Sequence, residues 1–367
     1  MRFSEVLEIK NGKNQRQVEN PNGKYPIYGS GGVMGHADDY LCEAETVVIG
    51  RKGSINNPIF VEEPFWNVDT AFGLVANKDL LLPKYLYYFC INFNFEALNT
   101  TVTIPSLTKA NLLQIEINIP SIAEQSKVVS KLDKISKLIE LRKQQLEELD
   151  QLVKSRFIEL FGDPFNNKKW DTQKLRNISV SISDGSNVDK AYYKEKGDVL
   201  FLRIQNVWFN EFRLDDSVYI SEDVNNEYLE TSLHHGDLLI TKIGRYYTKD
   251  SSLGRVSVYL GEDDKANYSN NIMRVRLTDE VCSEFVNVLM NLDDYNRYIR
   301  EVSVGGTDKR ALSKAIIGDL PIIMPPKELQ IEFLEFVEQT DKSKLAIQKS
   351  LEKLEILKKS LMQQYFG

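Results

Sequence analysis

Few residues in this chain have the types and spacing that catalysis or metal binding requires. Its three cysteines, Cys42, Cys90 and Cys282, lie far apart, so none forms the Cys-x-x-Cys spacing of a zinc or redox site. The adjacent pair His234 and His235 precedes a predicted strand, which favours a turn over a set of metal ligands. We expect small buried thiols and no metal site in this chain.

Two segments carry part of an enzymatic pattern and lack the rest. GEDDK (261–265) places Asp263 near Lys265, as half of a nuclease site would, but no partner acid follows in a recognisable frame. An exposed turn explains that segment better. DPF (163–165) lacks the second proline of the Asn/Asp-Pro-Pro-aromatic methylation motif, and there is no GxxxxGK[ST] phosphate loop. We therefore expect no catalytic residues here.

The composition indicates an ordinary globular protein of two or three domains. The chain has 367 residues, of which 42% are hydrophobic and 27% charged. Its 46 basic and 53 acidic residues give a net charge of −7, which argues mildly against a self-sufficient nucleic-acid binder. No apolar stretch is long enough to span a bilayer, and MRFSEVLEIK (1–10) lacks the apolar core of a signal peptide. We expect a cytoplasmic protein.

The chain repeats itself at a fixed offset of 205 residues. LTKANLLQIEINIPSIAEQ, from Leu107, aligns without a gap with LSKAIIGDLPIIMPPKELQ, from Leu312. The matching anchors include Lys109 with Lys314, Pro120 with Pro325, Gln125 with Gln330, and the closing Phe161-Gly162 with Phe366-Gly367. Two unrelated helices can share leucines by chance, but not proline, glutamine and Phe-Gly at one offset. The pattern predicts an internal duplication.

Each copy ends in a predicted long helix. After Pro120 and Pro325, which suit a helix start, no proline or glycine occurs until Gly162 and the chain end. Apolar residues recur at the spacing of a coiled-coil seam, as at Leu132, Ile139, Leu146, Val153 and Leu160, and at Val337, Ile347, Leu351, Leu354 and Leu361. Arg142, Arg156, Lys344 and Lys358 interrupt these seams, so we expect the helices to pair with each other, although separate amphipathic helices remain an alternative.

A mixed α/β globule precedes each long helix. The expected strands are 45–50, 57–63 and 70–77 in the first half, and 199–207, 237–244, 254–260 and 271–277 in the second. Helices are expected at 82–93 and 284–300. The predicted fold is α+β, with domains 1–119 and 163–324 and long helices 120–162 and 325–367. Antiparallel pairing of the helices would make this layout pseudo-twofold and nearly circular.

The order of these segments resembles that of the specificity (S) subunit of type I restriction–modification systems. The segments that carry the resemblance are YPIYGSGGVMG (25–35), VVIGRKGSI (47–55), NVDTAFGL (67–74), GDLLITKIGR (236–245) and YSNNIMRV (268–275), with the helix entries IPSIAEQ (119–125) and MPPKELQ (324–330). Single glycine-rich loops are weak signals, but their doubled order is specific. The second entry has ELQ where the family usually has EQ, a minor departure.

The resemblance implies a DNA-recognition subunit without a catalytic centre. Its two target recognition domains would each read one half of a split, asymmetric sequence in double-stranded DNA. The antiparallel coiled coil would fix the spacer and dock two modification (M) methyltransferase subunits, which carry S-adenosylmethionine. Restriction (R) translocase/endonuclease subunits would use ATP and Mg, so this chain itself needs no cofactor. Such a subunit can take part of its phosphate neutralisation from its partners.

Basic and amide residues beside turns are the expected DNA contacts. Arginine suits bidentate contact to guanine, and asparagine or glutamine to adenine, while tyrosine and glycine-rich backbone can approach sugar and phosphate. The candidates are Tyr28, Gly29, Ser30, Gly31, Arg51, Lys52, Arg203, Gln205, Asn206, Lys242, Arg245, Tyr246, Lys249, Asn270, Asn271, Lys309 and Arg310. For each of them an ordinary solvated loop or turn residue is the competing interpretation.

Two alternatives to a type I specificity subunit stay open. The first keeps DNA and changes the system: an S-like subunit of a methylation-only enzyme or of a type IIB-like enzyme. The second belongs to another class, a protein-scaffolding rod with two binding heads and no nucleic acid, and the negative net charge is its motivation.

Overall fold

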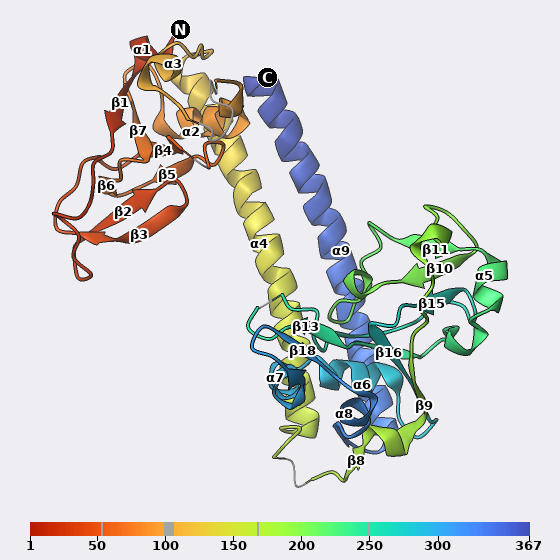
Figure 1. Cartoon of the computed structure of the whole chain (residues 1–367). Coiled ribbons are helices and arrows are strands. Elements are labelled where there is room, and N and C mark those ends of the chain that lie inside the picture. The colour runs from red at the N-terminus through yellow and green to blue at the C-terminus, as the bar shows by residue number, and fades with distance from the viewer. Residues whose placement is uncertain (53, 99–105, 167–168, 249) are drawn as a thin grey trace. The chain divides into compact units, whose positions relative to one another are not determined.

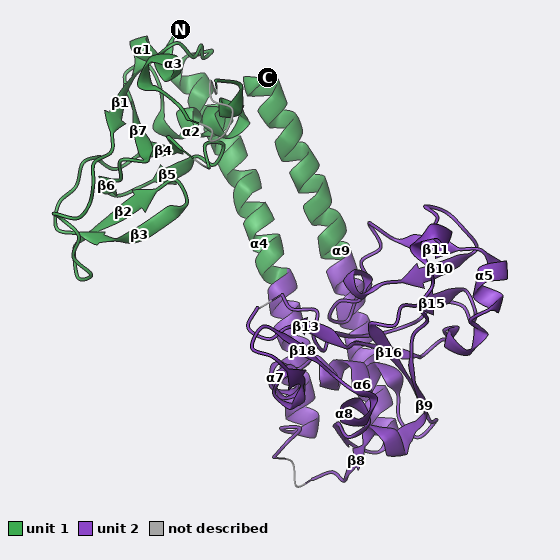
Figure 2. Cartoon of the chain, in the orientation of Figure 1, with its two compact units in different colours: residues 1–145, 346–367 green, residues 146–345 purple. Residues whose placement is uncertain are grey.

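The computed structural model describes all residues except 53, 99–105, 167–168 and 249, and the chain divides into two compact units (Figure 2). Unit 1 contains residues 1–145 and 346–367, and unit 2 contains residues 146–345. The two long helices are α4 (Ile122–Phe161) and α9 (Lys327–Phe366). Each helix has one segment in unit 1 and the other in unit 2 (Figures 1 and 2). Both helices and the mixed α+β character follow the expectations from the sequence.

Unit 1 has its core between an antiparallel sheet, with strand order β1-β7-β4-β5, and helix α2 (Pro83–Asn92). A second sheet has the order β3-β2-β6. The strands are β1 (Leu7–Asn11), β2 (Tyr25–Gly29), β3 (Gly32–Ala37), β4 (Thr46–Gly50), β5 (Ile59–Val61), β6 (Trp66–Asn67) and β7 (Ala71–Ala76). The shorter helices are α1 (Phe3–Val6), η1 (Phe95–Leu98) and α3 (Lys109–Leu113). Strand β4 is buried throughout, as its run of β-branched residues predicts.

Unit 2 packs the helices α6 (Ser283–Met290) and α7 (Asp293–Val302) with an antiparallel sheet of order β14-β12-β16-β9. The strands of unit 2 are β8 (Thr172–Lys174), β9 (Ser179–Asp184), β10 (Val199–Leu202), β11 (Val218–Ile220), β12 (Leu238–Thr241), β13 (Ile243–Arg245), β14 (Val256–Val258), β15 (Ala266–Tyr268), β16 (Ile272–Leu277), β17 (Val304–Gly305), β18 (Lys309–Ala311) and β19 (Pro321–Ile323). The remaining helices are η2 (Leu175–Ile178), η3 (Lys190–Tyr192), η4 (Ile204–Asn206), α5 (Glu222–Asn226), η5 (Leu229–Thr231) and α8 (Lys314–Gly318).

Three of the expected elements are wrong in part. The strand expected at 237–244 is interrupted at Lys242, and its two parts, β12 and β13, belong to different sheets. The strand expected at 199–207 ends at Leu202, and η4 follows it. The helix expected at 284–300 is two helices, because the Asn291 side-chain amide donates to Asn210 Oδ1 at 2.8 Å and to the Val256 carbonyl at 3.0 Å. These bonds turn the chain at the end of α6 and tie it to β14. The apolar periodicity continues across this break, so it could not reveal it.

A buried glutamine joins the start of α4 to helix α2 of unit 1. Gln125 is fully buried, and its carboxamide oxygen accepts the backbone N–H of Leu82, the residue that caps α2, at 2.8 Å. Its amino group donates to the carbonyl of Pro120 at 2.9 Å. One side chain thereby satisfies polar groups at two helix starts that the core would otherwise leave without partners.

The same arrangement recurs in unit 2 at the same offset. Gln330 is fully buried, accepts the N–H of Cys282, which caps α6, at 2.9 Å, and donates to the Pro325 carbonyl at 2.9 Å. Both glutamines were matched in the sequence alignment as anchors without an assigned role. Their shared contacts explain why the repeat retains glutamine at this position.

The far end of each long helix also packs in the same way. In unit 2, Phe161 at the end of α4 lies edge-to-face with Phe285 of α6, with ring centroids 5.0 Å apart. In unit 1, Phe366 at the end of α9 lies edge-to-face with Tyr85 of α2, also at 5.0 Å. Each unit therefore contains the beginning of one long helix and the end of the other.

Within each unit the two helix segments run antiparallel. In unit 1, Lys131 lies by Tyr365 (3.3 Å), and Lys143 lies by Glu355 (3.3 Å). In unit 2, Lys344 forms an ion pair with Asp150 at 2.7 Å. Burial alone would lower the pKa of Lys344, but the hydrogen bond and charge of Asp150 outweigh it and raise that pKa. A lysine that interrupts the apolar seam is thus paired across it.

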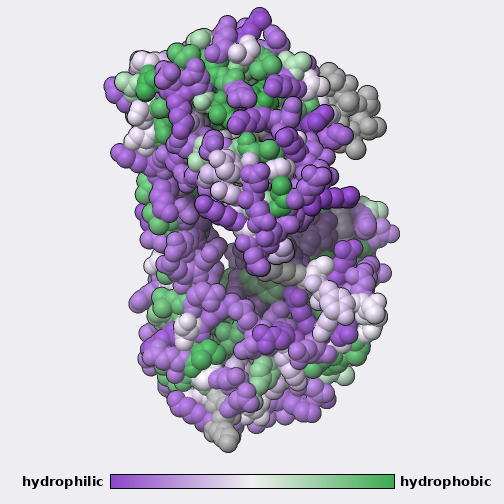
Figure 3. All heavy atoms as spheres, turned by 90° about the vertical axis from the view of Figure 1, so that its left-hand side faces the viewer, coloured by the Kyte–Doolittle hydropathy of each residue, from purple (hydrophilic) through white to green (hydrophobic). Residues whose placement is uncertain are grey.

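Among the described residues, no helix has a segment that is both long enough and apolar enough to span a lipid bilayer. Figure 3 shows hydrophilic residues over most of the face in view, with hydrophobic residues interspersed among them.

We predict that Gln330→Met destabilises the chain by about 2–4 kcal/mol, because a buried N–H and a buried carbonyl lose their partner while the side-chain volume is kept. Hydrogen exchange at the Cys282 amide should accelerate together with a lower urea midpoint. The exposed residue Gln339, on the same helix, provides the matched control, and Gln339→Met should change neither. Equal behaviour of the two variants would show that the Gln330 contacts do not hold the helix start.

Candidate nucleic-acid interface

A loop whose backbone is hydrogen-bonded on both sides follows the buried strand β4 of unit 1. The Arg51 N–H donates to the Thr70 carbonyl at 2.8 Å, and the Arg51 carbonyl accepts the Leu107 N–H at 2.9 Å. The Arg51 side chain is exposed, with its guanidinium 5.6 Å from the centre of the Phe72 ring. Lys52 is exposed beside it. A fixed backbone therefore presents two cations at the end of this strand.

The hairpin β2–β3 brings a second set of predicted residues to the same place. A Cβ at Gly50 would lie 2.9 Å from Ser30 Cβ, so the hairpin turn rests against the end of β4 and requires glycine there. Gly32, with φ +115°, makes the turn that follows Gly31. Tyr28 is half-buried against Phe65, with the ring centroids 5.3 Å apart. Tyr28, Gly29, Ser30, Gly31, Arg51 and Lys52 thus form one cluster.

Unit 2 has the corresponding loop after strand β12. The Lys242 N–H donates to the Asn271 carbonyl at 2.9 Å, and the Lys242 carbonyl accepts the Leu312 N–H at 2.8 Å. Leu312 is the residue matched to Leu107 in the repeat. The Lys242 side chain differs from that of Arg51, because it forms an ion pair with Asp184 and is only 14% exposed. The backbone hydrogen bonds therefore recur in both units, whereas the exposed cation of Arg51 has no counterpart at Lys242.

The strands β13 and β18 carry three more of the predicted residues, and a fourth, Tyr246, follows β13 directly. Arg245 is the register partner of Lys309, and Gly244 that of Arg310. The Arg310 guanidinium lies 3.9 Å from the centre of the Tyr246 ring, in cation–π contact. Arg245, Tyr246, Lys309 and Arg310 therefore form a basic and aromatic patch next to Lys242.

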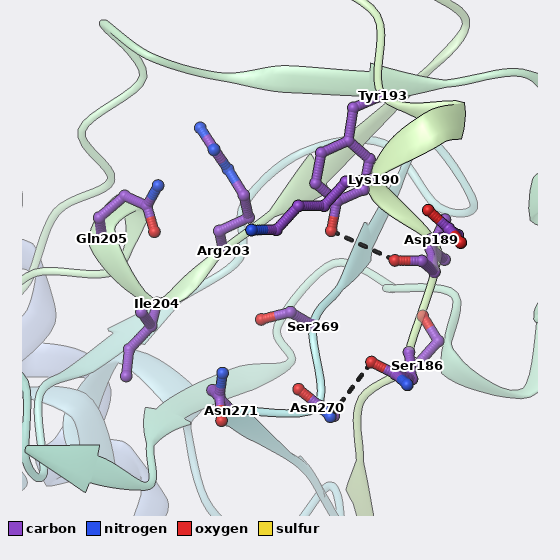
Figure 4. Close-up of a pocket in the computed structure, with 12 residues that line it drawn as sticks. Ser186, Asp189, Lys190, Tyr193, Arg203, Ile204, Gln205, Ser269, Asn270 and Asn271 are labelled. Atoms are coloured by element: carbon purple, nitrogen blue, oxygen red, sulfur yellow. Dashed lines mark hydrogen bonds between the residues drawn. The ribbon is translucent and has the colours of Figure 1, made fainter.

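Four more of the predicted residues of unit 2 lie around a cavity of about 590 Å³. Arg203, Gln205, Asn270 and Asn271 line it, together with Lys190, Ser269 and several residues of the segment after β9 (Figure 4). The Lys242–Asn271 hydrogen bond joins this cavity to the basic patch on β13 and β18. Predicted residues that are far apart in the sequence thus gather in one region of unit 2.

Two predicted residues do not belong to this group. Asn206 is fully buried, and its amide donates to the Arg213 carbonyl and to Asp216 Oδ1, each at 2.9 Å. Its carboxamide is used inside the protein, so its role in the described fold is to hold the η4 loop. Lys249 lies outside the described residues.

Three carboxylates lie against predicted cations of unit 2. The positions of basic residues along the sequence did not predict these pairs. Asp184 pairs with Lys242, while Asp216 pairs with Arg203 at 3.2 Å and Asp308 with Arg245 at 3.9 Å. The side-chain hydrogen bond from Gln205 and the charge of Arg203 lower the pKa of Asp216. In the described part of the chain, Lys309 and Arg310 have no carboxylate partner.

Two of the three cysteines are buried thiols. Cys42 and Cys90 are buried, as expected, and burial raises the pKa of Cys42 to about 11, so its thiol stays protonated at neutral pH. Cys282 is only partly buried. Across the described ranges, no three His, Cys, Asp or Glu side chains gather as a metal site.

We predict that acetic anhydride labels Lys309 faster than Lys242, because Lys309 is exposed whereas Asp184 and burial restrict the Lys242 amine. Asp184→Asn should raise Lys242 labelling several-fold, measured by peptide mass spectrometry. Asp308→Asn, which alters the partner of Arg245, should leave Lys242 labelling unchanged. Similar labelling of both lysines in the wild-type chain would contradict the pairing.

The sequence and the fold both resemble those of type I restriction–modification proteins. Residues 1–151 match the family model described as type I restriction modification DNA specificity domain. The specificity subunit of the type I restriction enzyme MjaIX from Methanocaldococcus jannaschii is 23% identical over 337 residues, which cover 86% of this chain and 73% of that protein. The StySPI specificity subunit from Salmonella potsdam is 22% identical, with coverage of 79% and 65%.

The matches do not span every relative completely. The Haemophilus influenzae relative S.HindORF215P is 26% identical over 277 residues, which are 68% of this chain and 64% of that protein. About a third of that relative and of the Salmonella relative therefore lies outside the match.

Solved structures share the fold over the full length of the chain. The S subunit of a type I restriction–modification system from M. genitalium has a TM-score of 0.63 at 16% identity, with coverage of 100% of this chain and 95% of that one. A second structure, from work on complex assembly of the type I system, has a TM-score of 0.58 at 14% identity, with coverage of 100% and 96%. Residues 1–151 therefore match the type I restriction modification DNA specificity domain, and the resemblance of the chain to type I specificity subunits is confirmed.

Proposed function

We propose that this chain is the DNA-specificity subunit of a type I restriction–modification complex. The observation that carries the proposal is the strand-end loop present in both units, in which the backbone of a basic residue is hydrogen-bonded on both sides to backbone groups at corresponding places. In unit 1 the loop exposes Arg51 beside Lys52. In unit 2 Lys242 is largely buried, and the loop adjoins the cations and amides of β13, β18 and the cavity. Such groups suit phosphate contacts that position a duplex and base-edge contacts that select its sequence.

The two units would each read one half of a split DNA target. The Gln125 and Gln330 contacts and the packing of Phe161 and Phe366 recur at one sequence offset, which supports a duplicated recognition domain. Because the domains differ in their loop residues, the two half-sites would differ as well. The proposed target is therefore asymmetric and bipartite.

The long helices would dock the modification subunits. Several apolar side chains on α4 and α9 remain exposed in this chain, among them Leu138 (45%), Leu152 (47%), Leu345 (51%) and Ile356 (69%). Exposed leucine and isoleucine on a helix suit a protein partner. In the proposed complex S-adenosylmethionine, ATP and Mg belong to the M and R subunits, and this chain contributes recognition without a catalytic group.

The proposal is tested by selecting DNA with the assembly that co-purifies with this chain. A tag on the chain is used to isolate the assembly from its own host, and random duplexes that bind it are sequenced. We expect two short conserved blocks separated by an unspecified spacer, with binding that weakens steeply as salt rises. No enrichment, or binding unaffected by salt, would contradict the proposal and favour a protein scaffold.

We predict that Arg51→Gln weakens specific duplex binding about ten-fold or more and relaxes selection in one block alone, as expected for the loss of one base contact. The matched control is Lys78→Gln, which also removes one positive charge. Lys78 follows β7, and the register of β7 with β4 places it at the opposite end of the sheet from Arg51. Equal effects of the two variants, or changes in both blocks, would contradict the assignment of Arg51.

A further inference from the structure

The cavity of unit 2 contains polar side chains that the protein itself does not use. It is lined by η3, by η4 and by the turn Ser269–Asn271 between β15 and β16. Its walls are held by internal hydrogen bonds, including Asn270 N–H to the Ser186 carbonyl at 3.0 Å and Ser269 N–H to the Leu202 carbonyl at 2.9 Å. Its shape is therefore set before any ligand arrives.

Three side chains in this cavity are directed into the open space. Figure 4 shows the Lys190 amine, the Ser269 hydroxyl and the Asn271 carboxamide converging from η3 and from the facing turn. Among the residues that the structure describes, none of these three groups has a hydrogen-bond or ion-pair partner. A cation and two neutral hydrogen-bonding groups are thus available at one place.

The other charged residues that line the cavity are already engaged. The Arg203 guanidinium points away from Ser269 and Asn271 (Figure 4) and pairs with Asp216 at 3.2 Å. Asp189 accepts the N–H of Ala191 at 2.9 Å and so caps η3. The Asp189 carboxylate keeps its charge, but its hydrogen bond holds it at the start of η3. Lys190 is therefore the cation that the lining residues leave without a carboxylate partner, and it favours an anionic ligand.

We infer that this cavity binds a phosphodiester group of a DNA strand, an inference that rests on the proposed function and assigns part of it to named residues. Lys190 supplies the charge-assisted contact, and Ser269 and Asn271 donate to the remaining phosphate oxygens. The volume of about 590 Å³ exceeds what a lone phosphate needs and leaves room for the adjoining sugar. Asn270 and Gln205, at the edge of the same cavity, then face the neighbouring nucleotide.

The charged contact and the two neutral contacts have different signatures in the salt dependence of binding. Each neutralised phosphate releases counterions, so Lys190→Gln should reduce the slope of log K against log salt by about 0.9. If affinity at 1 M salt is unchanged, that slope corresponds to a loss of about fifteen-fold at 50 mM and about four-fold at 200 mM salt. Ser269→Ala and Asn271→Ala remove neutral hydrogen bonds and should weaken binding roughly three- to ten-fold at every salt, with the slope kept.

The experiment measures binding of the selected duplex by the tagged assembly, with full-length wild-type or variant chain, over a range of salt. Lys196→Gln is the matched control, because Lys196 is exposed nearby but does not line the cavity. It should keep the wild-type slope, and thermal unfolding should show that all four variants remain folded. Inorganic phosphate at millimolar concentration and constant ionic strength is the second probe.

Each outcome decides the inference. A slope reduced by Lys190→Gln and kept by Lys196→Gln supports it. Equal slopes for these two variants, with a wild-type assembly that binds DNA, overturn the cavity assignment and leave the proposed function intact. Phosphate binding that depends on Lys190 but leaves DNA binding unchanged identifies a free-phosphate site and also overturns it. A wild-type assembly that binds no duplex contradicts the proposed function and the inference together.

Discussion

A single buried carboxamide at the start of each long helix is the contact on which each unit depends. Gln125 and Gln330 each join the first turn of the long helix to the cap of the helix that covers the main sheet. Because both glutamines are fully buried, their hydrogen bonds are shielded from water. Loss of either side chain would leave a buried N–H and a buried carbonyl without a hydrogen-bond partner. This contact fixes the helix entry against the sheet whose strand ends carry the candidate site.

The electrostatics of the site reflect the acidic character of the whole chain. In unit 2 the cations of Lys242, Arg203 and Arg245 each have a carboxylate neighbour, whereas in unit 1 Arg51 lies over an aromatic ring. Partial neutralisation lowers the affinity for phosphate in general and leaves more of the discrimination to hydrogen bonds. In the proposed complex, partner subunits would supply the missing positive charge, which accounts for a net charge of −7 in a DNA-recognition subunit.

Elements that are set by local sequence patterns could be predicted from the sequence. Features that depend on contacts between residues far apart in the chain could not. The apolar runs of β4 and β12 and the proline-free helices α4 and α9 are local signals and were predicted from the sequence. The break at Asn291 depends on Asn210 and Val256, which lie far from it in the sequence, and periodicity does not register such contacts. The same holds for the site. Basic residues near turns were identified by type, but burial of Asn206, pairing of Lys242 with Asp184, and the role of Lys190 require the folded cavity.

The most direct test of the central claim, that this chain selects the DNA sequence on which its complex acts, is methylome sequencing. Cells that carry the gene with its adjacent methyltransferase gene are compared with cells in which this gene alone is deleted. The account predicts a split N6-methyladenine motif that disappears on deletion and returns on complementation. A methylated motif that persists unchanged without this chain would contradict the account, because another protein would then be selecting the sequence.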